Sequence, residues 1–239
     1  DWYNIRLEDA LAFRGSQSVL NACYLDVGVT GGPADEAQRA LFCGFVTRDP
    51  GGNILDLRQT SFNLAQGEVE GYDFSAKYAL LDTALGNLTF QWDNTYTTKN
   101  TLTGTIGEYN GAPNWRLRSN LTVGWQQGNW DATYAARYYS GMDESCGYAG
   151  FFDAGFTVQE LCNNYRPDGL AAENRIGATT YHDLQVGVSV PWNARIAVGG
   201  RNIFGKEPPI TRNAFAHSFD GSYDLPGGGY YYIQYKQKF

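Results

Sequence analysis

Two histidines are the residues in this 239-residue chain whose chemistry best suits acid–base catalysis or metal binding. His182 precedes Asp183, a pairing found in catalytic triads, but neighbouring residues on a strand point to opposite faces, which defeats the geometry that a triad needs. Neither His182 nor His217 has a metal-ligand partner at helical or hairpin spacing. We therefore expect no catalytic residue, no metal site and no cofactor, and a protein that is not an enzyme.

Four cysteines form two separated pairs, Cys23 with Cys43 and Cys146 with Cys162. Their spacing lacks the Cys-x-x-Cys pattern that is typical of zinc sites. Two local disulfides, formed in an oxidising compartment, account for the spacing better than free thiols do. Each pair lies within a long polar segment, where a disulfide would limit the conformational freedom of the chain.

Aromatic and charged side chains gather in two long segments, in a pattern suited to binding a small molecule by stacking and hydrogen bonding. The first segment runs from Gly141 to Gly177 and the second from Gly205 to Gly228. The candidate ligand-binding residues are Tyr148, Phe151, Phe152, Tyr165, Arg166, Arg212 and Phe215. For each of them, packing within the loop around the expected disulfide is the alternative role.

The elements that position these segments are strands, because apolar and polar residues alternate with a period of two. From Trp115 to Gln126, tryptophans at both ends bracket aliphatic residues on one face, while Arg116 and Arg118 lie on the other. Aromatic rings favour the level of the lipid headgroups, so this arrangement is typical of strands that cross a membrane. The same pattern recurs at Leu88–Tyr96 and Trp130–Tyr138.

Eight such strands are expected, joined by connections that alternate between very short and very long. The strands are Asp1–Phe13, Ile54–Leu80, Asn87–Thr98, Asn114–Gln126, Trp130–Ser140, Thr179–Val190, Ala194–Phe204 and Gly229–Phe239. The tight turns are Leu81–Gly86, Gln127–Asn129 and Pro191–Asn193. All short connections then lie at one end, as in outer-membrane barrels with periplasmic turns and long extracellular loops. A soluble antiparallel sheet also alternates, but gives no reason to segregate its loops by length.

The alternation also predicts which charged side chains face the interior of such a barrel, where they can hydrogen-bond to water or to other protein groups. These residues are Asp73, Lys77, Asp93, Arg116, Arg118, Asp131 and Arg137. Two short helices are expected in the first long segment, at Ser18–Tyr24 and Ala34–Phe42.

The composition excludes two classes of protein. No stretch approaches the roughly 18 consecutive apolar residues that a membrane-spanning helix needs. The chain carries 25 acidic and 18 basic residues, for a net charge of −7, and has no basic cluster that would neutralise a phosphate backbone. Helical membrane proteins and nucleic-acid-binding proteins are therefore not expected.

Three motifs resemble a known family. The most specific runs from Gly200 to Pro209, and its matching residues are Asn202, Ile203, Phe204, Pro208 and Pro209; Tyr223-Asp224 and a strand that ends at Phe239 follow it. The others are Glu68–Phe74 and the loop in which Cys43 precedes Arg48-Asp49-Pro50 and Gly52. Over essentially the whole chain, these motifs resemble the C-terminal barrel region of TonB-dependent outer-membrane transporters. Gln237 departs from the family's usual terminal pattern.

The resemblance implies an all-β fold, an antiparallel transmembrane β-barrel with long extracellular loops. By this resemblance, residues 1–239 are the C-terminal portion of the barrel domain, about eight strands of a 22-stranded wall. The N-terminus shows no signal peptide, and the family's plug domain and its TonB-engaging segment are absent. The chain is therefore expected to be a fragment of a longer protein.

The resemblance also implies active transport in the outer membrane of a Gram-negative bacterium. The expected cargo is a scarce nutrient such as a ferric siderophore, a cobalamin or an oligosaccharide. The expected partners are the TonB–ExbB–ExbD complex, reached through the missing N-terminal part, and membrane lipid. The alternative is a self-contained eight-stranded barrel with a structural or adhesive role, in which the first strand would pair with the last.

Overall fold

The computed structural model describes residues 1–13, 15–25, 36–59, 61–102, 104–145, 173–211, 214 and 218–238. By its internal contacts, the chain divides into two units. The first unit comprises Asp1–Ile5 and Glu68–Phe239, and the second comprises Arg6–Gly67. Among the described residues, no helix is both long enough and apolar enough to cross a membrane.

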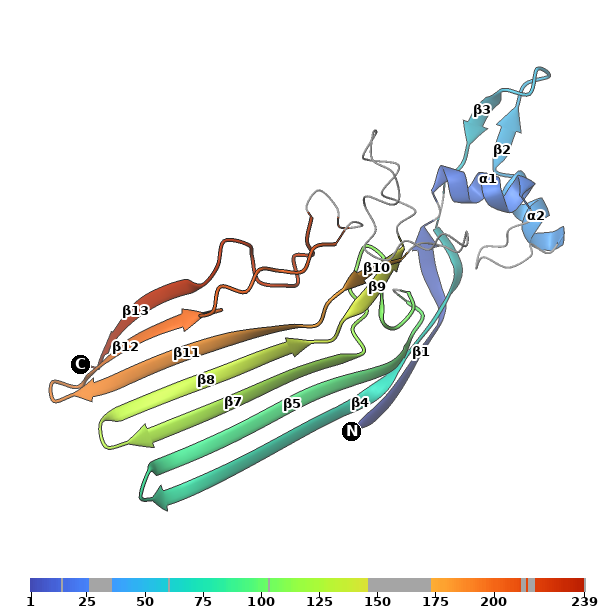
Figure 1. Ribbon diagram of the computed structural model, residues 1–239. Coiled ribbons are helices and arrows are strands. Elements are labelled where there is room, and N and C mark those ends of the chain that lie inside the picture. The colour runs from blue at the N-terminus through green and yellow to red at the C-terminus, as the bar shows by residue number, and fades with distance from the viewer. Residues whose placement is uncertain are drawn as a thin grey trace. The chain divides into compact units, whose positions relative to one another are not determined.

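An eight-stranded sheet makes up most of the first unit. Its strands lie in the order β1, β4, β5, β7, β8, β11, β12 and β13 (Figure 1). The order in the sheet is therefore the order in the sequence, and the strands missing from it belong to two smaller sheets. The bounds are β1 Trp2–Phe13, β4 Ser61–Thr83, β5 Gly86–Asn100, β7 Leu117–Gln127, β8 Trp130–Tyr139, β11 Thr179–Val190, β12 Ala194–Arg201 and β13 Tyr230–Gln237. The pairings from β4 to β13 are all antiparallel. The predicted all-β architecture is therefore confirmed.

The sheet is open, because β1 and β13 lie at its two edges. A closed eight-stranded barrel would require hydrogen bonds between these two strands. The structure therefore does not support the alternative of a self-contained eight-stranded barrel.

The short turns lie together at one end of the sheet (Figure 1). The β7–β8 turn contains Gly128, whose φ of 57° is in the left-handed region, and the β11–β12 turn contains Asn193 with a φ of 56°. Such backbone angles suit tight hairpins, since they match the twist of the flanking strands, and glycine and asparagine tolerate them best. The predicted segregation of short and long connections is confirmed.

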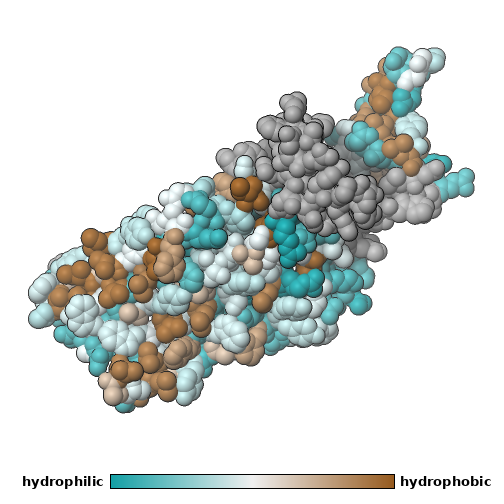
Figure 2. Space-filling view, viewed as in Figure 1, coloured by the Kyte–Doolittle hydropathy of each residue, from teal (hydrophilic) through white to brown (hydrophobic). Residues whose placement is uncertain are grey.

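The two faces of the sheet differ as the alternation predicts. One, called here the apolar face, exposes aromatic and aliphatic side chains from every strand between β4 and β13, among them Tyr72, Phe74, Tyr78, Trp92, Leu121, Leu184, Val198 and Ile233. Figure 2 shows hydrophobic residues gathered toward the end of the sheet that carries the short turns. The opposite face, called here the polar face, carries charged and amide side chains.

A small three-stranded sheet forms within the long connections of the first unit. It consists of β6 (Glu108–Tyr109), β9 (Met142–Ser145) and β10 (Glu173–Ile176), in the order β10, β9, β6. The core of this region contains Tyr109, Met142, Ile176, Tyr181 and Tyr223, each at most 4% exposed. Residues from three different connections therefore share one apolar cluster.

The second unit contains two short helices and a hairpin. Helix α1 spans Ser16–Tyr24 and α2 spans Glu36–Cys43, close to the predicted helices. Strands β2 (Val46–Arg48) and β3 (Ile54–Leu57) form the hairpin, whose turn is fixed by hydrogen bonds from the backbone and side chain of Asn53 to Asp49 (2.8 and 2.9 Å). These bonds hold the pKa of the Asp49 carboxyl below its usual value.

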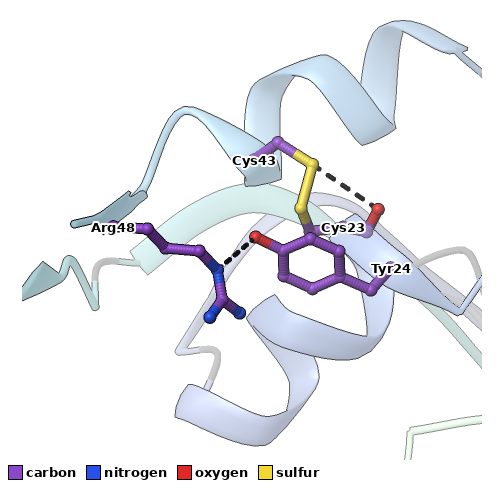
Figure 3. The surroundings of a disulfide bond; sticks show 4 residues. All are labelled: Cys23, Tyr24, Cys43 and Arg48. Atoms are coloured by element: carbon purple, nitrogen blue, oxygen red, sulfur yellow. Dashed lines mark hydrogen bonds between the residues drawn. A yellow bond between two sulfur atoms is a disulfide. The ribbon is translucent and has the colours of Figure 1, made fainter. Parts of the chain in front are cut away.

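The predicted disulfide between Cys23 and Cys43 is present and joins the two helices (Figure 3). The Cα atoms of the two cysteines are 4.9 Å apart. Around the bond, Val19, Ala22 and Phe42 form a small buried core. The second unit therefore combines a covalent tie with limited hydrophobic packing.

Replacing both Cys23 and Cys43 with serine should lower the local stability of the second unit by about 2 kcal/mol, the lower end of what a natural disulfide contributes. The loop closed by the bond has a sequence separation of 20, and the small core retains part of the helix packing. The measurement is the rate of limited proteolysis within residues 6–67. An unchanged cleavage rate would contradict the prediction, and the thermal transition of the eight-stranded sheet serves as the control.

One predicted strand is wrong at its start. The sequence indicates a single strand over Ile54–Leu80, whereas Ile54–Leu57 forms β3 and the long strand begins at Ser61. The alternation does identify a strand, but its partner is local: Val46 pairs with Leu57, and the Arg58 amide donates to the Phe45 carbonyl (2.9 Å). A tight turn at residues 49–52 makes this hairpin available within the loop.

Candidate functional site

The polar face is the surface most suited to a function other than membrane contact. Six of the seven predicted interior residues share it by strand register: Asp73, Lys77, Asp93, Arg118, Asp131 and Arg137. The seventh, Arg116, precedes β7 and lines a hollow of about 460 Å³ with residues of the β5–β7 connection.

A hollow of about 680 Å³ lies against the polar face at β4, β5 and β7, and Asp73, Asp93, Arg118 and Asn120 are among its lining residues. Asp93 accepts hydrogen bonds from Ser75 and Gln91 (both 2.6 Å), and Thr95 donates to Asp73 (2.8 Å). Neutral donors thus satisfy part of the hydrogen-bonding capacity of each carboxylate. The result is a hydrophilic wall that remains open to a ligand, to water or to another protein segment.

Arg137 is a highly connected side chain on this face. Its guanidinium forms a bidentate pair with Asp183 (2.9 and 3.1 Å) and a second pair with Asp224 (3.0 and 2.6 Å). It also lies over the ring of Tyr181, 5.2 Å from the centroid. Since the Arg137 side chain is only 16% exposed, these pairs are shielded from water more than surface ion pairs are.

Asp224 belongs to the β12–β13 connection, and it is bound by two arginines, Arg137 and Arg201 (2.8 Å). Burial opposes ionisation of this carboxyl, but hydrogen bonds from both arginines and their positive charges outweigh that effect. The pKa of Asp224 is therefore held below its ordinary value. At neutral pH the contact is a charged one.

Residues 220–226 of the same connection, called here the strap, lie against three other segments. The Tyr109 hydroxyl donates to Asp220 (2.9 Å), and the Trp115 indole donates to the Tyr223 hydroxyl (2.9 Å). Burial raises the pKa of Tyr223 to about 12, so its hydroxyl stays protonated. Together with Asp224, these contacts bind the strap to the polar side of the sheet.

Trp115 is not on the apolar face, contrary to the sequence prediction. Strand β7 begins at Leu117, and the irregular backbone before it turns the Trp115 ring to the polar side. There it lies 4.8 Å from the Tyr139 ring and 5.5 Å from the Tyr223 ring, with the Arg118 guanidinium 5.8 Å away. The expected aromatic bracket of this strand is therefore incomplete at its loop end.

Asn202, in the motif after β12, stabilises a turn. It has a φ of 53°, is 2% exposed and donates its backbone N–H to Asp183 (2.8 Å). Its side chain donates to the Lys206 carbonyl and accepts from the Lys206 amide (both 2.9 Å), replacing a pair of backbone bonds. Asparagine tolerates the left-handed conformation and supplies both bonding groups. Ile203 and Phe204 lie within this turn, and the buried Pro208 and the half-buried Pro209 follow it.

His182 and Asp183 point to opposite faces, as predicted. The His182 ring lies on the apolar face, where its Nδ1 is 2.6 Å from the Tyr134 hydroxyl and its ring centroid is 5.1 Å from that of Phe204. Asp183 faces the other way, to Arg137. This separation rules out a triad built on the pair. His217 lies outside the described residues.

A second polar network crosses the sheet from β8 to β13. Arg195 pairs with Asp131, and the Gln185 side chain links Arg195 (2.8 Å) to the Tyr232 hydroxyl (2.9 Å). The Tyr232 ring lies directly over Gly199, so a Cβ at residue 199 would come within 2.6 Å of that ring. The glycine therefore makes room for a ring that carries the network to the edge strand.

Replacing Gly199 with alanine should displace the Tyr232 ring and cost about 1 to 2 kcal/mol through overpacking. The measurement is thermal unfolding of the complete protein in detergent micelles. Gly221→Ala is the matched control, since nothing lies within 4 Å of a Cβ there. Equal stability of the two variants would contradict the assigned role.

The ligand-binding residues predicted in the long loops lie outside the described residues, as do Cys146, Cys162 and Phe239. They are Tyr148, Phe151, Phe152, Tyr165, Arg166, Arg212 and Phe215.

Three residues of the polar face are not among the candidates predicted from sequence: Asp183, Arg201 and Tyr230. Asp183 and Arg201 occupy polar positions in the alternation of β11 and β12. That signal was sufficient to place them beside the charged residues that were predicted.

Three comparisons with known proteins bear on this fold. The model of the TonB dependent receptor-like β-barrel family matches residues 1–203. The siderophore receptor PirA from Acinetobacter baumannii is similar in structure, with 14% identity and a TM-score of 0.52 over 100% of this chain and 29% of that one. The copper transporter OprC has 12% identity and a TM-score of 0.48, covering 98% of this chain and 28% of that one. No curated protein matches.

The chain thus spans less than a third of the length of either of these two proteins. The family model covers most of the present sequence, including seven of the eight strands of the main sheet. The open sheet, its apolar outer face and its charged inner face agree with that match. This chain belongs to the family of TonB-dependent receptor β-barrels.

Proposed function

We propose that this chain is the C-terminal portion of the barrel of an outer-membrane transporter that takes up a scarce nutrient. The observation that carries the proposal is the two-faced open sheet, in which one face suits lipid and the other holds ion pairs. Apolar side chains facing lipid and polar ones facing the interior are what a transmembrane barrel wall requires. The family match supports outer-membrane transport as the general activity.

The proposed partner is the TonB–ExbB–ExbD complex, which would act through a plug domain encoded before Asp1. The wall described here would contribute part of the interior surface. Its hollow at Asp73, Asp93 and Arg118 is available for contact with such a domain or with hydrated cargo. The cargo class is a ferric siderophore, a cobalamin or an oligosaccharide.

The test is energised uptake by cells that carry the complete gene or a deletion of it. Growth is measured with iron, cobalamin or an oligosaccharide as the limiting nutrient, one at a time. The deletion should abolish growth on one nutrient class, and removal of TonB or addition of a protonophore should have the same effect. Uptake that is insensitive to both treatments would contradict an active transporter.

A further inference from the structure

A third hollow, also of about 460 Å³ but distinct from the one at Arg116, lies between the strap and the polar side of β12 and β13. Its lining includes Arg201, Tyr223, Asp224 and Tyr230, together with the backbone of Gly227 and Gly228. It lies at the end of the sheet where the long connections begin, since β13 starts at Tyr230. A molecule entering from the loop side would reach it before the deeper wall.

Tyr230, which lines this hollow, stacks on a second tyrosine, Tyr232. Tyr230 pairs with Arg201 in the strand register, and its ring lies 6.1 Å from that of Tyr232 with an interplanar angle of 28°. Tyr232 is held by Gln185 and by its position over Gly199. Tyr230 is 70% exposed, so the stack presents one free aromatic ring on a supported base.

The polar groups beside the ring supply both donors and acceptors. Arg201 is 60% exposed, and its guanidinium has N–H groups beyond the one bound to Asp224. Asp224 also lines the hollow, and its carboxylate has acceptor capacity beyond the three hydrogen bonds from its two arginines. Hydroxyl groups, which donate and accept together, complement such a mixed pair better than a purely accepting anion does.

The charge around this hollow is balanced. Two arginines, Arg137 and Arg201, face two aspartates, Asp183 and Asp224, in one connected network. An anionic chelate would gain little attraction from Arg201, because Asp224 already neutralises it. A neutral ring with an apolar face and several hydroxyl groups avoids that penalty and stacks on Tyr230.

We propose that this hollow is a subsite for a neutral sugar ring, which stacks on Tyr230 and hydrogen-bonds to Arg201 and Asp224. The proposal rests on the transport function proposed above and selects an oligosaccharide from its three cargo classes. Tyr232 supports Tyr230 and Arg137 positions Asp224. Neither of these two residues is required to contact the sugar.

The test is titration calorimetry on the complete receptor in detergent, with a panel of neutral hexasaccharides built from glucose, xylose or mannose. At least one sugar should bind, and Tyr230→Ala should weaken its binding about tenfold, equivalent to roughly 1.4 kcal/mol. Tyr230→Phe, which keeps the ring, should bind within about twofold of the unmodified receptor. Tyr235→Ala is the matched control, because that tyrosine is exposed on the apolar side of the same strand.

Absence of binding by every sugar in the panel would overturn the proposal, as would equal affinities of the Tyr230→Ala and Tyr235→Ala variants. Uptake measurements separate this outcome from the broader function. If TonB-dependent uptake of a ferric chelate or a cobalamin proceeds unchanged in Tyr230→Ala, the sugar subsite is wrong and the transporter remains. If a sugar binds through Tyr230 but is never taken up, the transport proposal fails instead.

Discussion

Replacing Arg137 with leucine should lower the free energy of unfolding by about 3 to 5 kcal/mol, the usual cost of removing one partner from a shielded ion pair. The substitution leaves Asp183 and Asp224 close together, 26% and 10% exposed, without the cation that separates them. It also removes one of the contacts that bind the strap to the wall, while the Arg201–Asp224 contact remains. Thermal or denaturant unfolding of the complete receptor in detergent measures the loss.

Arg175→Ala is the matched control for this variant. Arg175 also pairs with an aspartate, Asp143, but its side chain is 69% exposed. A water-exposed pair of this kind is worth about 1 kcal/mol or less. Comparable destabilisation of the two variants would show that the Arg137 network does not have the strength assigned to it.

The same network predicts a dependence on pH. The pKa of Asp224 is lower in the folded protein than its ordinary value of about 3.9, so ionised Asp224 stabilises the fold above that pH. As the pH falls through the folded-state pKa, this contribution is lost. Asp224→Asn should therefore flatten the decline in stability between about pH 5 and the acid limit. An unchanged acid profile in the variant would contradict the assignment.

Placing arginine on the apolar face should have the second large effect. Leu121→Arg puts a charge near the middle of β7 on the face assigned to lipid, at a cost of about 2 to 4 kcal/mol if the site is near the bilayer midplane. Much of the protein should then fail to reach the membrane in a folded form. The measurement is the amount of heat-modifiable receptor in the outer-membrane fraction.

Thr122→Arg is an unusually close control, since Thr122 is the next residue and faces the polar side. It introduces the same charge into the same strand, at nearly the same depth. The arginine there can reach water and the carboxylates of the wall, so insertion should be nearly normal. If both variants inserted equally, the assignment of the two faces would be wrong.

Most of the sheet could be predicted from sequence because its signals are local. Alternation over residues 117–127 fixes both the strand and its faces, and Gly128 marks the turn that follows. The predicted bounds of Thr179–Val190 are those of β11. A period of two, read between turn residues, is enough for such elements.

The errors occur where the outcome depends on distant partners. Ile54–Leu57 has the alternation of a strand, but periodicity does not reveal that its partner is Val46–Arg48. Trp115 continues the alternation of β7, yet it packs against Tyr223, which is 108 residues away in the sequence. Likewise, the alternation places Asp183 among the polar positions of its strand, but it does not reveal that the partner of Asp183 in space is Arg137.

The strap also bears on the order in which this wall assembles. Its contacts join Tyr109 to Asp220 across 111 residues and Arg137 to Asp224 across 87. Contacts between such distant residues form late, because the intervening chain must first be organised. Pairing across a tight turn, as between β7 and β8, joins residues that are much closer in sequence. The strap should therefore close only after the hairpins up to β12 have formed, so that its docking marks the completion of this part of the barrel.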